Sequence, residues 1–207
     1  MKRTAPENVT RTVASYERGM AEYLANYSES PTIRAFRSKV ARRLGRGARL
    51  LELGSGPGDD ALYFESQGIA VTRSDATRAF VERMRDAGQE ARLLDVTADD
   101  LPTGYDGVYA NAVLLHLTRT QFADALEKAA RSVTAPGLLA LTMKEGDGDA
   151  WTSAKLARPR FFTYWREGAL LAALRAAGWE PSYVEHVTAR EPWINCICAL
   201  AARADDA

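Results

Sequence analysis

The chain has 207 residues, which is enough for one domain of ordinary size with a buried core. Lys and Arg together number 27, as do Asp and Glu, so the formal net charge is zero and nothing global attracts nucleic acid or an anionic membrane. The first residues lack the apolar stretch of a signal peptide, and no apolar run approaches the roughly 18 residues of a membrane span, so we expect a cytoplasmic protein.

Two helices are predicted within residues 8–44, with a break near Ser30 and Pro31. Ala, Arg and Glu recur in this segment, and these residues favour helix. Aromatic and apolar side chains fall on roughly one helical face: Tyr16, Met20, Tyr23, Leu24 and Tyr27. We expect residues 1–46 to form a helical cap on a core of residues 47–207, the whole chain being a single domain.

Short apolar runs then alternate with amphipathic stretches. We expect strands at residues 49–53, 69–73, 91–94, 105–112, 137–143, 179–187 and 193–202, and helices at 59–67, 77–87, 119–132 and 166–177. Regular alternation of strand and helix predicts an α/β fold whose seven-stranded sheet is mostly parallel and has helices on both faces. The last two strands have no helix between them, so we expect an antiparallel C-terminal hairpin at the sheet edge.

A glycine-rich loop follows the first of these strands, in the sequence LLELGSGPGDD of residues 50–60. Glycine backbone can turn tightly and approach a ligand closely. Asp75 lies 21 residues after Gly54, at the end of the second strand, near the ~20 expected of an acid that binds ribose hydroxyls. Ligands of such sheets bind at the carboxyl ends of the strands. The loop therefore indicates a nucleoside-binding site.

The charge around this loop selects among nucleosides. Asp59 begins the following helix, and an acid there repels a pyrophosphate, which needs the positive helix end for itself. This argues against a nicotinamide-dependent dehydrogenase. S-adenosylmethionine has a sulfonium, an ammonium group and a ribose but no phosphate. Glu52, Asp59 and Asp60 suit its positive charge.

Four segments resemble, in order, the motifs of class I S-adenosylmethionine-dependent methyltransferases: LLELGSGPG, VTRSDAT, ARLLDV and YDGVYANAVLLHL. The resemblance extends over roughly residues 49–202 and implies a Rossmann-like fold. It implies that the cofactor is bound by Glu52, Gly54, Ser55, Gly56, Gly58, Asp75, Ala76, Asp95, Val96, Asn111 and Ala112. Relatives often place an N-terminal tyrosine over the cofactor, for which Tyr16, Tyr23 and Tyr27 are candidates, Tyr16 and Tyr27 being preferred. Asp95 has an alternative role as a turn or helix-capping acid.

His116 follows the fourth main strand, near the expected position of the methyl group. It is either a general base or a side chain that packs and hydrogen-bonds around the cofactor. The metal-dependent relatives place acids at the ends of the fourth and fifth strands. Here those positions hold Asn111 and the pair Lys144 and Glu145, so we expect no metal.

The segment of residues 143–165 is expected to be a mobile loop that closes over the acceptor, because Gly146 and Gly148 lie near its start and aromatic residues lie near its end. Its candidate substrate-binding residues are Lys144, Arg160, Phe162, Tyr164 and Trp165. The two cations would meet an acidic or polar group of the substrate. The alternative is that the aromatic side chains pack against the sheet.

The function that we expect is methyl transfer from S-adenosylmethionine to an oxygen or nitrogen atom of a small-molecule acceptor, with S-adenosylhomocysteine as the product. The protein would be a monomer or a homodimer, with no nucleic acid or membrane as partner. Methylation of protein or RNA, for which residues 37–49 offer only one ambiguous basic stretch, is an alternative. A non-catalytic S-adenosylmethionine-binding subunit is another, although the intact glycine loop favours catalysis.

Overall fold

The computed structural model describes residues 4–28, 30–154, 156–188 and 191–201. In chain order its elements are α1 (Glu7–Asn26), α2 (Pro31–Leu44), β1 (Arg49–Leu53), α3 (Asp59–Ser66), β2 (Ala70–Asp75), α4 (Arg78–Asp86), β3 (Ala91–Leu93), β4 (Tyr105–Asn111), the 3-10 turn η1 (Leu114–His116), α5 (Arg119–Ser132), β5 (Val133–Lys144), β6 (Asp149–Thr152), β7 (Arg160–Thr163), α6 (Glu167–Ala176), β8 (Trp179–Val187) and β9 (Trp193–Leu200). No helix within these ranges is long and apolar enough to cross a membrane.

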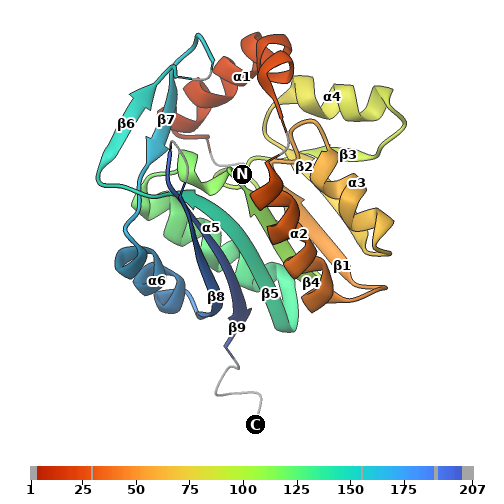
Figure 1. Ribbon diagram of the computed structural model, residues 1–207. Coiled ribbons are helices and arrows are strands. Elements are labelled where there is room, and N and C mark those ends of the chain that lie inside the picture. Colours follow the sequence, from red (N-terminus) through yellow and green to blue (C-terminus); the bar gives the residue numbers. More distant parts are fainter. Residues whose placement is uncertain (1–3, 29, 155, 189–190, 202–207) are drawn as a thin grey trace.

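Seven strands form the main sheet in the order β3-β2-β1-β4-β5-β9-β8 (Figure 1). The first five are parallel, and β9 runs antiparallel to both β5 and β8. The predicted sheet and its C-terminal hairpin are confirmed. The strand order reverses at β1 and β4, so the carboxyl ends of these two strands flank the point where such sheets bind ligands.

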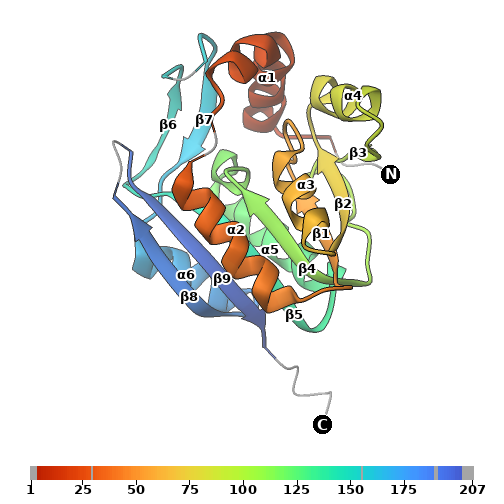
Figure 2. The same ribbon diagram turned by 45° about the vertical axis from the view of Figure 1, so that its right-hand side comes forward.

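Helices cover both faces of the sheet because each has one apolar stripe to bury. Helices α2 and α3 place Phe36, Val40 and Phe64 against Leu50 and Tyr109 on one face. On the other face α5 and α6 bury the apolar side chains Phe122, Leu126, Leu170 and Leu174. Figure 2 shows α2 in front of the sheet and α5 behind it.

Helix α1 lies across the carboxyl edge of the sheet, beside α4 and the β6–β7 hairpin (Figures 1 and 2). Its polar side chains attach it there. The carboxylate of Glu17 accepts hydrogen bonds from the first main-chain N–H groups of α4, at Arg78 and Ala79. On the hairpin side, the N–H of Phe161 donates to Thr12 Oγ1 over 3.0 Å, and Ser15 Oγ donates to the carbonyl of Pro159 over 2.6 Å.

Residues 149–163 differ from the expected irregular loop. Strands β6 and β7 form a separate antiparallel pair, in which Trp151 is opposite Phe161 with ring centroids 5.7 Å apart. Aromatic side chains favour strands when they can pack across a pair. Strand β5 also begins earlier than predicted, because Val133 pairs with Tyr105 of β4 before the regular ladder starts. The end of the last predicted strand, at residue 202, lies outside the described residues.

Candidate active site

The glycine loop between β1 and α3 has little space on one side and open space on the other. Gly54 has φ 65°, and a Cβ atom there would lie 2.3 Å from Cγ2 of Val113. Gly56 has φ 51°, and a Cβ atom there would meet nothing within 4 Å. The N–H of Gly58 donates to the carbonyl of Ser55 over 2.8 Å, which closes the turn. The loop is therefore tightly packed at Gly54 and accessible to a ligand at Gly56.

Asp75 lies at the end of β2 and holds this loop in place. Its Oδ2 accepts a hydrogen bond from the N–H of Gly56 over 2.9 Å, and its Oδ1 accepts one from the N–H of Thr77 over 2.7 Å. Burial raises the pKa of Asp75, and these two hydrogen bonds act in the opposite direction. Each carboxylate oxygen can accept a second hydrogen bond, so the carboxylate can still accept hydrogen bonds from the two ribose hydroxyls.

Glu52 is a buried carboxyl group next to the loop, with only 2% of the residue exposed. Its Oε2 has no hydrogen-bond partner among the described residues. Burial, together with the charge of Asp60, raises the pKa of Glu52 to about 8. A cation bound beside Glu52 would favour its ionised form and offset part of the cost of burying it.

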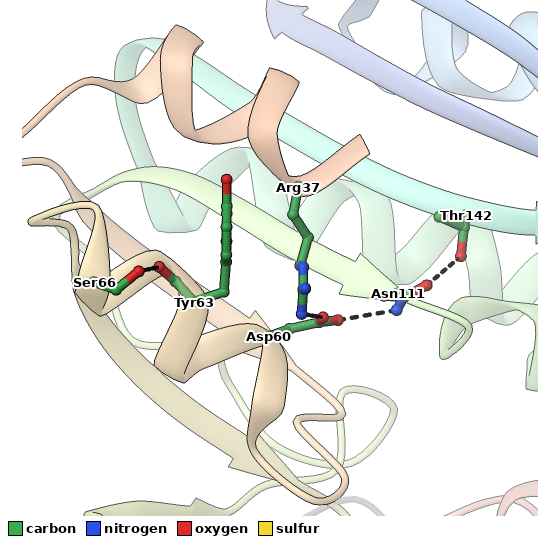
Figure 3. Close-up of polar contacts among 6 residues, drawn as sticks. All are labelled: Arg37, Asp60, Tyr63, Ser66, Asn111 and Thr142. Atoms are coloured by element: carbon green, nitrogen blue, oxygen red, sulfur yellow. Dashed lines mark hydrogen bonds and ion pairs between the residues drawn. The ribbon is translucent and has the colours of Figure 1, made fainter. Parts of the chain in front are cut away.

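A chain of hydrogen bonds crosses the site from α2 to β5 (Figure 3). Arg37 Nη1 donates to Asp60 Oδ1 over 2.6 Å, and Asn111 Nδ2 donates to Asp60 Oδ2 over 2.9 Å. Thr142 Oγ1 then donates to Asn111 Oδ1 over 2.8 Å and accepts from the N–H of Ala112 over 2.9 Å. Ala112 has φ 57°, an uncommon conformation for a residue with a Cβ atom. The network fixes the end of β4 in this conformation.

Sequence analysis missed Arg37 and Thr142 in this network. Arg37 had a signal, because it lies directly after Phe36 and three residues before Val40, on the face of α2 that is buried. A charged residue on a buried helical face needs a partner of opposite charge. Thr142 gave no such signal, because threonine is common in strands.

Asp95 stabilises a turn, which is the alternative to cofactor binding that the sequence offered for it. Its Oδ1 accepts hydrogen bonds from the N–H and the hydroxyl of Thr97, over 2.8 and 2.6 Å. Val96 is buried, and its carbonyl accepts a hydrogen bond from Lys128. Ala76 is half-buried directly after β2. Cofactor contacts by these three residues stay predictions.

His116 is hydrogen-bonded on both ring nitrogens. Nδ1 lies 2.6 Å from the carbonyl oxygen of Phe161, and Nε2 lies 3.1 Å from Tyr16 Oη. A carbonyl only accepts, so Nδ1 carries the proton and Nε2 accepts from the Tyr16 hydroxyl. Burial, together with the charges of Arg160 and Lys144, lowers the pKa of His116 to about 4. His116 is therefore neutral at pH 7.

Tyrosines of α1 line the same region. The Tyr16 ring meets Tyr23 edge-on at 5.6 Å, and Tyr23 lies 5.8 Å from Tyr27 and 5.5 Å from Phe80 of α4. Burial raises the pKa of Tyr27 to about 12, and the charge of Asp60 adds to this effect. Of these three tyrosines, Tyr16 thus lies beside His116, and Tyr27 lies near Asp60.

Phe162 lies between the two predicted substrate-binding cations. Lys144 Nζ is 4.5 Å from the centre of the Phe162 ring, and the guanidinium carbon of Arg160 is 5.3 Å from it. The ring of His116 is 4.6 Å away, and that of Tyr164 is 6.5 Å away and stacked. The structure therefore groups Lys144, Arg160 and Tyr164 around Phe162, whose ring also contacts His116.

Trp165 lies apart from this group and packs in the main core. Its ring is 4.9 Å from that of Phe122, and the guanidinium of Arg119 lies 4.2 Å from its centre. This is the packing alternative for Trp165, and a contact with substrate stays a prediction. Within the described residues, no three His, Cys, Asp or Glu side chains are grouped as a metal site requires.

Comparison with known proteins places the fold. The sequence model of a family described as "methyltransferase domain" matches residues 20–184. Among curated proteins, none matches the chain. The solved structure of 1,6-didemethyltoxoflavin-N1-methyltransferase from Burkholderia thailandensis, with bound 1,6-didemethyltoxoflavin and S-adenosylhomocysteine, is 20% identical, with a TM-score of 0.75 over 98% of this chain and 93% of that one.

Two further solved structures show how widely the fold is used. Magnesium protoporphyrin IX methyltransferase from Synechocystis, with bound S-adenosylhomocysteine, is 14% identical, with a TM-score of 0.76 over 94% of this chain and 100% of that one. The [4+2]-cyclase SpnF is 19% identical, with a TM-score of 0.67 over 82% of this chain and 81% of that one. The same fold thus carries a cyclase as well as methyltransferases, so the assignment of chemistry depends on the site residues.

Proposed function

The chain belongs to the methyltransferase-domain family, and on that basis we propose that it transfers a methyl group from S-adenosylmethionine to an oxygen or nitrogen atom of a small-molecule acceptor. The observation that carries the proposal is the meeting of an accessible glycine loop, a buried aspartate that accepts a hydrogen bond from this loop, and an unpartnered buried carboxyl group at the carboxyl ends of β1 and β2. These are Gly56, Asp75 and Glu52.

The residues present fit this cofactor. Asp75 would accept the ribose hydroxyls, Glu52 would face a positive group, and the open side of Gly56 would let the ligand approach the main chain. When bound, S-adenosylmethionine supplies a methyl group already activated by the sulfonium, for in-line displacement without a metal. The solved relatives with S-adenosylhomocysteine bound support the same cofactor here.

The chain itself supplies alignment and exclusion of water. Helix α1 and the β6–β7 hairpin are hydrogen-bonded to each other across the carboxyl edge of the sheet, through Thr12 and Ser15 of α1. The aromatic rings of Tyr16 of α1 and Phe162 of β7 both contact the ring of His116. A flat apolar acceptor would fit such walls.

We further propose that His116 removes the acceptor's proton through Tyr16 rather than by direct contact. Its Nε2 is occupied by the Tyr16 hydroxyl, so Tyr16 Oη takes the proton from the acceptor while its own proton moves to Nε2. Histidine with a lowered pKa is a weak base. The arrangement therefore suits an acceptor atom whose proton is lost readily.

A small molecule is favoured over a protein or RNA as the acceptor. The family match spans most of the chain, and the first solved relative contains a bound small heterocycle, 1,6-didemethyltoxoflavin. The two cations whose charges lower the pKa of His116, Lys144 and Arg160, are both buried, which suits an enclosed pocket better than a basic groove on the surface.

Calorimetric titration of the purified protein with S-adenosylmethionine, S-adenosylhomocysteine and NAD tests the cofactor. We expect the two adenosyl compounds to bind and NAD not to bind. Methyl transfer is then measured by mass spectrometry against phenols, aromatic acids and amines. Binding of NAD alone, or of none of the three, would contradict the proposed function.

A further inference from the structure

Five cationic side chains are buried in the part of the chain that the structure describes: Arg37, Arg73, Lys128, Lys144 and Arg160. Four of them have oxygen partners that offset their charge. These pairs are Arg37 with Asp60, Arg73 with Glu65, Lys128 with the carbonyls of Val96 and Asp99, and Lys144 with Glu191. Arg160 differs, because no carboxylate or carbonyl among the described residues accepts a hydrogen bond from it.

Arg160 is only 4% exposed. Its single described hydrogen bond goes from Nη1 to the hydroxyl of Tyr16 over 3.2 Å. The rings of Tyr16 and Phe162 lie 5.4 and 5.3 Å from its guanidinium carbon. Its Nε is buried without a partner, and no described contact occupies Nη2.

An unneutralised buried charge is costly, and natural proteins retain one where a ligand neutralises it or a function needs it. The edge of a guanidinium formed by Nε and Nη2 matches the two oxygens of a carboxylate, which it binds through two parallel hydrogen bonds. This edge is the one that Arg160 leaves unoccupied. The aromatic rings beside it would contact an apolar body attached to that carboxylate.

We propose that Arg160 binds a carboxylate of the methyl acceptor, so that the acceptor is an organic acid with an apolar or aromatic body. This inference rests on the proposed function. Sequence analysis offered Lys144 and Arg160 equally for an acidic or polar group. Lys144 Nζ is already 2.8 Å from Glu191, which leaves Arg160 for this role.

S-adenosylmethionine also has a carboxylate, so Arg160 has two possible partners, the acceptor and the cofactor. Arg160 belongs to β7 and contacts Tyr16 and Phe162 near His116. Gly56, Glu52 and Asp75, on which the fit to the cofactor rests, lie instead at the ends of β1 and β2. This placement favours the acceptor.

The first test follows thermal unfolding while sodium chloride is replaced by sodium benzoate at constant ionic strength, with benzamide as the neutral counterpart. We expect benzoate to raise the Tm of the wild type by about 3 °C when its concentration is tenfold above its Kd, and benzamide to have no comparable effect. The rise should disappear in Arg160→Met and shrink in Arg160→Lys, which keeps the charge but lacks the planar fork. Arg158→Met is the matched control, because Arg158 is partly exposed and paired with Glu22.

Equal stabilisation of the wild type and Arg160→Met by benzoate would overturn the proposal, as would no stabilisation of the wild type by benzoate, hexanoate or 4-hydroxybenzoate. If Arg160→Met does not fold, the comparison with Arg160→Lys decides, because a bidentate site must lose at least threefold in benzoate affinity. Unchanged affinity in Arg160→Lys would count against the site.

The second test is calorimetric titration of the same variants with S-adenosylhomocysteine. We expect Arg160→Lys and Arg160→Met to bind it within threefold of the wild-type affinity. A tenfold loss would assign the carboxylate to the cofactor and overturn the proposal. If the wild type itself does not bind S-adenosylhomocysteine, the proposed function fails, whereas the benzoate measurements still report on Arg160.

Discussion

The hydroxyl of Tyr16 lies 3.1 Å from Nε2 of His116, although the two residues are separated by 100 positions in the sequence. Tyr16 belongs to α1 and His116 to the turn η1 after β4, so this contact joins α1 to the carboxyl end of β4. The ionisation and orientation of His116 therefore depend on the position of α1. Any movement of α1 would also change the proton-accepting group.

Replacing Tyr16 with Phe should slow methyl transfer by about 100-fold or more, because it removes the hydroxyl through which His116 would act. The affinity for S-adenosylhomocysteine should stay within threefold of the wild type. Initial rates with an acceptor found by the methyl-transfer screen provide the measurement. Tyr23→Phe is the control, since no described hydrogen bond involves its hydroxyl.

His116→Ala should produce a similar loss of turnover with little change in cofactor affinity. If Tyr16→Phe and His116→Ala both turn over at near wild-type rates, the pair is structural and the acceptor needs no base.

The lowered pKa of His116 predicts a dependence of stability on pH. The unfolded chain binds a proton at this residue near pH 6.5, whereas the folded protein does so only near 4. The free energy of unfolding should therefore fall as the pH decreases from 6.5 towards 4. At pH 5 the loss from this residue should be about 2 kcal/mol. Urea unfolding at pH 7 and pH 5 should show that loss in the wild type and not in His116→Gln.

His186 acts in the opposite direction, since hydrogen bonds to Glu167 and Glu145 raise its pKa. Its contribution is common to the wild type and His116→Gln, so the difference between the two proteins isolates His116. An identical pH dependence in both would show that burial does not hold His116 neutral.

Glu52 should make the free energy of unfolding depend on pH in the direction opposite to that of His116. Its pKa is about 8 in the folded protein, above the ordinary value of 4.5, so the folded state binds this proton more tightly than the unfolded chain. Stability from Glu52 is fully present below pH 4.5 and is lost as the pH rises towards 8. Glu52→Gln should therefore gain stability relative to the wild type between pH 5 and pH 8.

The exposed residue Glu127 supplies the control, and Glu127→Gln should follow the wild type. Calorimetry offers a second readout: wild-type affinity for S-adenosylhomocysteine should rise from pH 6 to pH 8, because the ligand's ammonium group favours ionised Glu52. A flat profile in both the wild type and Glu52→Gln would place that ammonium group away from Glu52.

Thr142→Val should destabilise the protein by roughly 1–3 kcal/mol, because it removes the partner of both Asn111 and the N–H of Ala112. Valine has nearly the same shape, so packing of β5 is retained. Thr134→Val, on an exposed position of the same strand, removes only one long hydrogen bond, from Thr134 Oγ1 to the carbonyl of Tyr105 over 3.3 Å, and should cost less than Thr142→Val. Equal effects of the two substitutions on urea unfolding would show that the network of Figure 3 contributes little.

Much of the fold follows from local pattern. The apolar run before Gly54, the glycines after helices and the missing helix between β8 and β9 predict the main sheet, because these signals lie within a few residues of each element. The β6–β7 hairpin was missed although its sequence contains Trp151, Phe161 and Phe162. Glycines and acids next to it indicated a loop, whereas pairing of aromatic residues across the two strands decides its structure.

The position of Asp75 beside the glycine loop was predictable, because one motif relates the two, and the hydrogen bond from Gly56 shows that they are neighbours. The contact of Asp75 with ribose stays a prediction. A role that depends on whether a side chain has a charged partner in the folded protein was not predictable from the sequence. The residue type of Arg160 suggested a cation for the substrate, but only the structure shows that Lys144 has a carboxylate partner and Arg160 has none among the described residues. The link from Arg37 to Thr142 likewise joins four elements that no local pattern relates.

Asp75→Ala should weaken S-adenosylhomocysteine binding by about 10- to 100-fold, because it removes the proposed acceptor of the ribose hydroxyls. It also frees the N–H groups of Gly56 and Thr77, so the glycine loop loses the contact that holds it to β2. Asp75→Asn keeps one oxygen acceptor and should lose less affinity. The control is Asp106→Ala, because Asp106 also accepts a main-chain hydrogen bond, from Arg49 at the opposite edge of the sheet.

Calorimetric titration of these three variants separates binding from folding. A large loss in Asp75→Ala with wild-type affinity in Asp106→Ala would establish Asp75 as the ribose acceptor. Since both aspartates support the main chain in the same way, an equal loss in the two variants would mean that the effect comes from a loosened sheet. Wild-type affinity in Asp75→Ala would place the ribose elsewhere and remove the main support for the cofactor assignment.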